Sequence, residues 1–386
     1  MNAINYLPRN KGGRGLRSLE TAYKTTKIKL ATKIIEDKDP RIVLVNSFHS
    51  NSIRSSSFSI FKDAERYAQE LGLKIDFSGN TIAVVDGATN ETMNGPITTV
   101  LKSRFLDINQ SEVLNSTWQG VNLKQRFQDE NVSKDYFSWL EKWTSCPTNV
   151  IQEFQLLFYQ LLPTKQYKAT RSHEPIEDLR CRICKMNNES VKHLISNCSV
   201  FAESVYISRH DNALKCFVWP LLYKLELSTK CPRWFANDVV APYYENESAK
   251  FWWDIPEYTG RDNENDHPAR PDGKLVINTE SEKKVFLIEM TVPWTENRDE
   301  KFQFKRSKYE QILSALKLEY INYEVDQITI VMDVFGGYSQ NLIDNIGKVF
   351  KEKEDVRSII KNMRKSVIAS GANISRMFKI RSGTRT

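Results

Sequence analysis

The spacing of apolar residues changes near the middle of this chain, and the change predicts two kinds of architecture. In the first half, apolar residues recur every three or four positions, which is typical of amphipathic helices. We therefore expect helices at about 55–71, 97–117, 133–145 and 148–162, and short strands near 73–77 and 82–86. A Gly- and Arg-rich loop at 6–20 leads into another helix, whose apolar positions fall roughly on one face: Leu16, Leu19, Tyr23, Leu30 and Ile34.

The second half has a strand pattern. A strand at 274–278 and a polar turn precede the apolar strand Val285–Glu289, and an amphipathic helix at about 299–318 leads to another apolar strand at 328–334. Between the halves we expect a linker at 163–175, a long helix from about 200 to 226 and an irregular region at 229–270. The pattern predicts an α+β protein in three parts: a mostly helical region 1–165, a small Cys-containing unit with its helix at 166–230, and an α/β domain with a basic helical tail at 231–386.

Composition adds an uneven distribution of charge. The 386 residues carry a net charge of +7 and an ordinary globular mixture of apolar and charged residues. No apolar run approaches the ~18 residues of a membrane span, and the basic N-terminus lacks the apolar segment of a secretory signal, so membrane and secreted classes are not expected. Residues 1–33 carry +7 and residues 357–386 carry +8, which leaves a net −8 for the rest. Basic ends suggest phosphate contacts, although solvated helix faces and a loose tail would give the same counts.

Four residues have the spacing of a structural zinc site. Cys181 and Cys184 form a Cys-x-x-Cys turn, and His193 and Cys198 follow within 18 residues of Cys181. Zinc takes four such ligands in a tetrahedron, and a closed site of this kind can supply about 10–16 kcal/mol of folding free energy. One alternative is a disulfide in a secreted protein, but the chain shows no signal peptide. Another is a redox Cys-x-x-Cys pair, which leaves the histidine unexplained. Three other cysteines are expected to be buried thiols: Cys146, Cys216 and Cys231.

Two carboxylates should meet at one strand edge. Asp272 precedes the first strand of the predicted hairpin and Glu289 ends the second, so the turn near 280 should bring them together. A charge beside a buried strand is costly unless it is paired or bound to metal, and one or two carboxylates suit Mg²⁺. Lys305 and Lys308 lie three residues apart on the next helix and could position a water or stabilise charge.

Each of these residues also has an ordinary explanation. An aspartate after a proline commonly caps a turn, a glutamate at a strand end can pair with Arg270, and lysines are common on helix surfaces. The order of strand, strand with terminal acid, helix with lysines and strand is what favours the catalytic interpretation.

Three blocks together resemble the C-terminal part of the polyprotein of site-specific, ribosomal-DNA-inserting non-LTR retrotransposons that carry a restriction-like endonuclease. Tyr6–Glu20 is similar to the thumb end of the reverse transcriptase, and Cys181–Cys198 matches the CCHC zinc knuckle. The endonuclease is matched by three short segments: Arg270–Asp272, Ile288–Asn297 and Lys305–Tyr309. Residues 40–160 match only loosely.

The resemblance implies a restriction-endonuclease-like C-terminal domain in a nuclear protein. Its activity would be Mg²⁺-dependent nicking of target DNA for target-primed reverse transcription, with Asp272 and Glu289 as metal-binding acids and Lys305 or Lys308 as the catalytic lysine. Its partners would be target DNA, element RNA and the polymerase part of the same element. Nucleic-acid contacts are expected from these residues: Arg9, Lys11, Arg14, Arg17, Arg209, His210 and Arg270. His210 can equally be an ordinary helix residue.

The chain departs from the family in two ways. Sixteen residues separate Asp272 from Glu289, more than is usual in the family, and an even insertion in the hairpin would preserve which face each side chain meets. The chain has no Tyr/Phe-x-Asp-Asp element of a polymerase palm, so we expect a fragment that does not reverse transcribe by itself. A nucleic-acid-binding protein that keeps the nuclease fold as an inactive scaffold is the alternative, and a purely structural zinc-organised helical protein is a weaker one.

Overall fold

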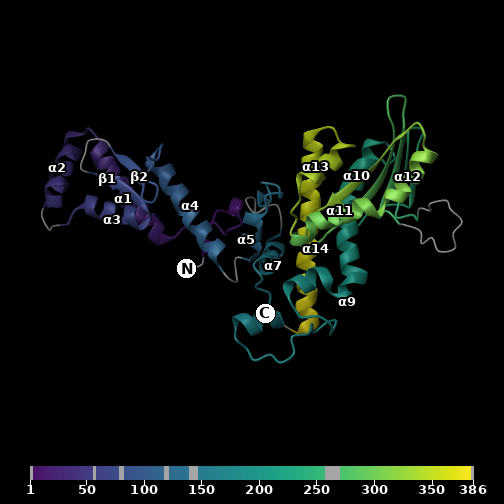
Figure 1. The fold of residues 1–386 in the computed structure, drawn as a ribbon, viewed down its shortest axis with the longest axis horizontal. Helices are drawn as coiled ribbons and strands as arrows, with labels where there is room; N and C mark the ends of the chain where they lie inside the picture. The colour runs from purple at the N-terminus through teal and green to yellow at the C-terminus, as the bar shows by residue number, and fades with distance from the viewer. Residues whose placement is uncertain are drawn as a thin grey trace. The chain divides into compact units, whose positions relative to one another are not determined.

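The computed structural model describes residues 3–54, 58–77, 82–116, 121–138, 147–256 and 270–383. The chain forms two compact units, Met1–Lys124 and Gln125–Thr386, where the sequence suggested boundaries at about 165 and 230. Helices and strands are mixed, as the α+β prediction requires (Figure 1).

The first unit is a small helical body around a two-stranded antiparallel sheet. Its elements are two 3₁₀ turns, Ala3–Asn5 and Arg9–Lys11, the helices α1 (Leu19–Glu36), α2 (Pro40–Arg54), α3 (Ile60–Glu70) and α4 (Ile97–Asn115), and the strands β1 (Leu73–Asp76) and β2 (Ala83–Asp86). The core is built mainly from α1, α3 and the two strands, with Phe61 and Leu73 fully buried. The predicted strands and the helices near 55–71 and 97–117 are present, whereas α2 was not expected.

The predicted apolar face of α1 is wrong in one respect. Leu16, Leu19, Tyr23 and Leu30 are exposed, and only Ile34 of the predicted five is buried. The helix instead packs on α3 through Ile28, Ala31 and Ile34. Lys24 pairs with Glu20 and Glu70 at 2.6 and 2.7 Å, so this end of the chain is a folded helix with part of its charge neutralised.

The second unit is built on a five-stranded sheet. The strands are β3 (Tyr243–Glu245), β4 (Ala249–Trp253), β5 (Gly273–Asn278), β6 (Lys283–Thr291) and β7 (Glu324–Val331), in that order across the sheet. All neighbours are antiparallel except β6 and β7, which are parallel. The predicted hairpin and final strand are thus present, and β3 and β4 form within the stretch 229–270 that the sequence presented as irregular.

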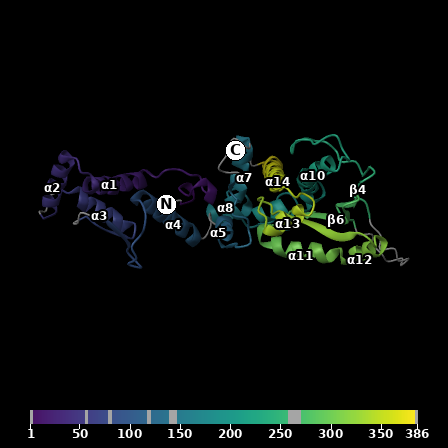
Figure 2. The ribbon, with the colours of Figure 1, turned by 90° about the horizontal axis from the view of Figure 1, so that it is seen from above.

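Helices cover both faces of this sheet. α10 (Ile207–Lys224), α13 (Gln340–Gly347) and α14 (Lys353–Ser382) pack on one face, where Phe286, Ile288 and Ile328 are buried. α11 (Arg298–Lys308) and α12 (Glu310–Glu319) cover the other, against Val285 and Leu287. Figure 2 shows α11 and α12 on one side of β6 and α10 and α14 on the other. The helix predicted at 299–318 is therefore two helices, broken at Tyr309.

The remaining helices pack against this body. They are α5 (Val121–Gln128), α7 (Thr148–Phe158), α8 (Lys165–Arg171), α9 (Ser199–Phe201) and the π-helical segments His193–Asn197 and Ala202–Tyr206. The predicted linker at 163–175 thus contains a helix, capped by the Thr164 hydroxyl. Of the helix predicted at 133–145, residues 134–137 form turns, residue 138 is helical and the rest lies outside the described residues. Of the helices in the described ranges, none combines the length and hydropathy needed to cross a membrane.

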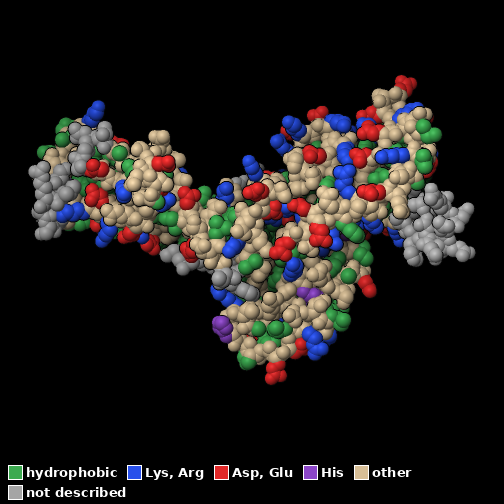
Figure 3. Space-filling model, in the orientation of Figure 1, with side chains coloured by type: hydrophobic (Ala, Val, Ile, Leu, Met, Phe, Trp, Pro, Cys, Tyr) green, Lys and Arg blue, Asp and Glu red, His purple; other side chains and the backbone are tan. Residues whose placement is uncertain are grey.

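The basic C-terminal segment is an integral helix rather than a loose tail. α14 extends for 30 residues, about 45 Å at 1.5 Å per residue, and lies beside α10 along its length (Figure 1). Glu153 of α7 accepts hydrogen bonds from Ser375 (2.6 Å) and Lys379 (2.8 Å). Arg364 is buried and pairs with Asp135 at 3.0 Å. Part of the +8 therefore holds the fold together, and Figure 3 shows charges of both signs mixed over the displayed face.

A buried ionic network joins α5 to the end of the sheet. Asp333, which is fully buried, accepts a hydrogen bond from Arg126 at 2.8 Å and from the backbone N–H groups of Phe335 and Gly337. Arg298 at the start of α11 donates to Asp129 at 2.9 Å and lies 3.7 Å from Asp333. These contacts attach the residues just after 124 to the second unit.

Candidate metal centre and carboxylate site

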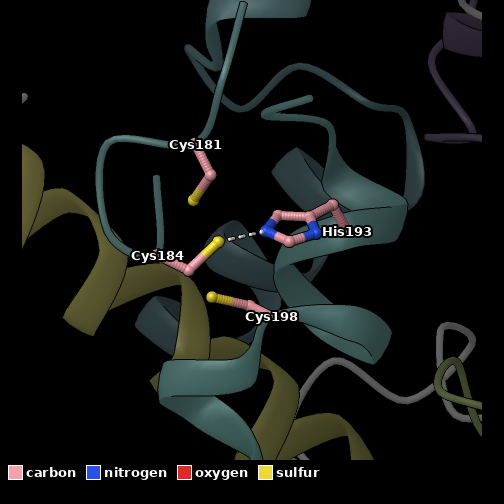
Figure 4. Close-up of side chains that lie close together, drawn as sticks. All are labelled: Cys181, Cys184, His193 and Cys198. Atoms are coloured by element: carbon pink, nitrogen blue, oxygen red, sulfur yellow. Dashed lines mark hydrogen bonds between the residues drawn. The ribbon is translucent and has the colours of Figure 1, made fainter. Parts of the chain in front are cut away.

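Four predicted ligands converge in the second unit. The candidate ligand atoms of Cys181, Cys184, His193 and Cys198 all lie within 4.8 Å of one another. Figure 4 shows the three sulfurs and the imidazole pointing toward a common centre, with Cys184 Sγ 3.2 Å from His193 Nε2. Cys181 and Cys198 are fully buried and His193 is 4% exposed. Three sulfurs and one imidazole nitrogen are a donor set that could hold a metal ion.

A tight turn supplies the first two ligands. The Cys181 carbonyl accepts a hydrogen bond from the Lys185 N–H at 2.8 Å, and Lys185 adopts a left-handed conformation (φ 61°) that closes the turn. Backbone N–H groups of Met186 and Asn187 outweigh the effect of burial and lower the pKa of Cys184. A thiol poised toward thiolate is the form that binds metal.

The buried ion pair between Arg182 and Glu189 supports this Cys turn. The Glu189 carboxylate is fully buried and accepts from the Arg182 guanidinium at 2.6 to 3.0 Å and from the backbone N–H of Lys165 at 2.9 Å. Arg182 also donates to the Pro163 carbonyl at 2.9 Å. The Cys turn is thereby fixed to the start of α8.

Helix α10 and the residues before it hold the other two ligands. The Tyr206 hydroxyl accepts from the Cys198 N–H at 3.1 Å and donates to the Leu194 carbonyl at 2.7 Å. Arg209, 3% exposed, donates to the Ile195 carbonyl at 2.8 Å, and burial lowers its pKa to about 10. The predicted nucleic-acid contact of Arg209 is therefore wrong, because its guanidinium is inside the protein and anchors the metal-ligand segment.

Two further described cysteines, Cys216 and Cys231, take no part in the cluster. Cys216 is buried in α10 as predicted, but Cys231 is exposed. Cys146 lies outside the described residues.

Asp272 and Glu289 lie near each other where the pairing of β5 with β6 ends. Gly273 of β5 is paired with Ile288 of β6, so Asp272 and Glu289 occupy the next rung of the antiparallel ladder. Side chains opposite each other in such a ladder have Cβ atoms about 4.5–5.5 Å apart. Glu289 alternates with Val285 and Leu287, so it faces α11 and α12.

Glu289 is a buried acid surrounded by donors. It is 2% exposed; one carboxylate oxygen accepts from Lys305 and the other from the Tyr309 hydroxyl at 2.7 Å. Burial, followed by the nearby charge of Asp272, raises the pKa of Glu289, although Lys305 and Tyr309 act in the opposite direction. The site therefore holds its carboxylates under mutual repulsion, which an added cation would relieve.

His210 contacts Asp272 at this site, whereas the sequence suggested it only as a nucleic-acid contact. Its Nε2 lies 3.1 Å from Asp272 Oδ2 and its Nδ1 3.0 Å from Asp211 Oδ1. Burial lowers the pKa of His210, but the two carboxylates outweigh it and raise the value to about 10. Asp272 Oδ2 also accepts from the Met290 N–H at 2.6 Å. The signal in the sequence was the charged triplet 209–211 at the start of an otherwise apolar helix.

The two candidate lysines differ in position. Lys305 contacts Glu289 directly, whereas the Lys308 ammonium donates to the Tyr309 hydroxyl at 2.9 Å. Arg270 does not pair with Glu289: its guanidinium pairs with Asp254 at 2.7 Å, and its carbonyl lies 3.1 Å from the Tyr309 hydroxyl. Lys305 is thus the lysine at the carboxylates.

The predicted nucleic-acid residues of the N-terminal loop lie in the first unit. All four are exposed: Arg9, Lys11, Arg14 and Arg17. Backbone hydrogen bonds fold this loop around the fully buried Leu7, including Gly15 N–H to the Leu7 carbonyl at 2.8 Å.

The donor set of the carboxylate site fits a hard cation in its chemistry. Asp272 and Glu289 supply two carboxylates at one strand edge, and the Met290 carbonyl lies beside His210 at 3.2 Å. Mg²⁺ is held by one or two carboxylates and keeps several waters. In the arrangement described here the carboxylates are instead bonded to Lys305, Tyr309 and His210.

Comparisons with known proteins give no identification: no protein-family model and no curated protein matches the chain.

Proposed function

We propose that this chain is a metal-dependent DNA endonuclease module of a site-specific non-LTR retrotransposon, which nicks target DNA so that the cut strand primes reverse transcription. The observation that carries the proposal is the convergence of Asp272, Glu289, Lys305 and Tyr309, from positions up to 37 residues apart. Metal-dependent phosphodiester hydrolysis can use paired acids to hold the ion, with a nearby cation to stabilise charge.

Each residue has a role in this proposal. Asp272 and Glu289 would hold a Mg²⁺ ion, which when bound polarises phosphate and lowers the pKa of a water. Lys305 would stabilise charge on the phosphate, and Tyr309 orients Glu289 through its hydroxyl. His210 contacts Oδ2 of Asp272 and so restricts the rotation of that carboxylate.

The cysteine cluster would bind zinc as a structural centre. Its ligands are one imidazole and three sulfurs, and no ligand position remains for substrate. DNA and element RNA would be the partners, and the exposed residues of the N-terminal loop would contact them. The C-terminal domain would be restriction-endonuclease-like and would work in the nucleus with the polymerase part of the same element.

The test is nicking of supercoiled plasmid DNA in the presence of Mg²⁺. We expect nicking by the full chain and at least a 100-fold loss, about 2.7 kcal/mol, in Asp272→Asn and Glu289→Gln, since each variant removes one of the two carboxylates that would hold the metal ion. Glu282→Gln is the matched control, because Glu282 is an exposed acid at the other end of the same hairpin. Equal nicking by all three variants would refute the active-site assignment.

One observation favours a second function. Lys305 and Tyr309 occupy both oxygens of Glu289, which is also what a stable, inactive ion-pair scaffold requires. A DNA-binding protein of this kind would bind DNA with a steep salt dependence, would not nick it, and would be indifferent to Asp272→Asn.

A further inference from the structure

Helix α14 presents a row of basic residues at every fourth position. Lys353, Arg357, Lys361 and Lys365 are spaced by four residues, so they lie on one side of the helix about 6 Å apart and span about 18 Å. The first three are exposed and Lys365 is half-buried, with its ammonium 6.0 Å from the ring of Trp234.

This row is unfavourable for the isolated fold. Among the described residues, no acid lies within ion-pair distance of any of the four, whereas the neighbouring Arg364 pairs with Asp135. Like charges four residues apart on a helix repel and destabilise it. Apart from the contact of Lys365 with Trp234, the row costs stability without forming an ion pair within the described residues, and this indicates an external anion.

The row borders a groove. A cavity of about 930 Å³ lies between α14, α13 and residues 133–138 of the same unit, and all four basic residues line it. Its floor includes the buried side chains of Tyr338, Phe350 and Ile360. Figure 3 shows Lys and Arg side chains at the edge of the molecule beside α13.

The groove has little negative charge to compete with an anion. Asp135 and Asp344 are its acids. Asp135 is bonded to Arg364, and Asp344 accepts a hydrogen bond from Gln340 at 2.9 Å. Lys351 lines the same groove, so five cations that form no ion pair with a described residue face it.

We propose that this groove binds the sugar-phosphate backbone of a nucleic-acid strand through the row Lys353, Arg357, Lys361 and Lys365. A linear array of cations over about 18 Å fits a polymer with regularly repeated phosphates, whereas a single small anion would need one convergent cluster. The proposal rests on the proposed function for the identity of the polymer as DNA, but the groove lies outside the carboxylate site and binds without a metal ion.

The experiment measures binding of a fluorescent 20-nucleotide single strand, and of the matching duplex, to the full chain in EDTA over a range of salt concentrations. The variant is Arg357→Gln/Lys361→Gln. The control is Lys283→Gln/Lys317→Gln, which removes the same charge from exposed residues of β6 and α12 that make no ion pair within the described residues. Melting curves verify that both variants fold, as exposed residues should allow.

Each neutralised phosphate contact lowers the slope of log K against log salt by about 0.9 for duplex and about 0.7 for a single strand. We expect the row variant to lose about 1.4–1.8 of the wild-type slope and the control to lose less than half of that. An unchanged slope, or an equal loss in both variants, overturns the groove. Polyglutamate is the comparison ligand. The proposal is also overturned if the row variant keeps DNA binding but loses binding to polyglutamate, because the ligand would then be an acidic polypeptide. Intact binding without nicking in Mg²⁺ would refute the nuclease and leave the groove standing.

Discussion

Replacing Cys198 with serine should remove the metal from the cysteine cluster. Cys198 is fully buried, and its sulfur lies with the other three ligand atoms within 4.8 Å. A serine hydroxyl is a poor zinc ligand in place of a thiolate, so three ligands would remain. Because Tyr206 and Arg209 hold the main chain between His193 and Cys198, the loss should spread into the start of α10.

The size of the effect follows from linkage. A structural zinc ion stabilises the folded state by about 4 kcal/mol when free zinc exceeds its dissociation constant 1,000-fold. In a unit of this size, each kcal/mol shifts the melting temperature by about 2–4 °C. Cys198→Ser should therefore melt about 8–16 °C below the wild type in zinc-containing buffer, and the two proteins should converge after chelation.

Metal content and melting temperature together give the assay. The purified wild type should hold one zinc per chain and Cys198→Ser almost none. Cys231→Ser is the control, because Cys231 is an exposed cysteine outside the cluster, and it should match the wild type in both measurements. A Cys198→Ser protein that keeps one metal per chain, or a wild type whose melting is indifferent to chelator, would refute the reasoning.

Two further substitutions test the surroundings of the two sites. Tyr309→Phe removes the hydroxyl that lowers the pKa of Glu289, so that pKa should rise further and the acid limb of a nicking-versus-pH profile should move to higher pH; an unmoved profile would contradict the role of Tyr309. Burial raises the pKa of Glu189, but Arg182 and two backbone N–H groups outweigh it and hold the pKa below the ordinary 4.5. The pair therefore stabilises above pH 4.5 and fades as pH falls through the lowered pKa. Glu189→Gln should cost about 3–5 kcal/mol at pH 7 in urea unfolding and less in acid, and a cost independent of pH would argue against this ion pair.

Local patterns were sufficient for much of the fold. Consecutive residues encode the apolar strand β6 and the turn before it. The same short hairpin sets the register that brings Asp272 close to Glu289. The ligand spacing of the cysteine cluster is local as well. A hairpin and a metal-ligand turn are both short-range structures, so the sequence carries their geometry almost completely.

Long-range contacts explain what the sequence did not reveal. His210 reaches Asp272 across 62 residues, and no periodicity encodes which helix will pack against which strand edge. The burial of Arg209 and the pairing of Arg364 depend in the same way on tertiary neighbours. The exposure of Leu19 shows the converse, because an apolar position on a helix does not say whether a partner covers it.

The buried network around Asp333 limits where this protein can be shortened. The boundaries near 165 and 230 that the sequence suggested would be natural places to start an expressed fragment, the first for both sites and the second for the carboxylates without the cysteine cluster. Either would delete Arg126 and leave the fully buried Asp333 with Arg298, at 3.7 Å, as its neighbouring cation. Removing one partner of a buried ion pair costs about 3–5 kcal/mol, which is a large share of the free energy of unfolding of a domain. A workable fragment should therefore begin before α5, even though that helix lies far in the sequence from every proposed ligand and catalytic residue.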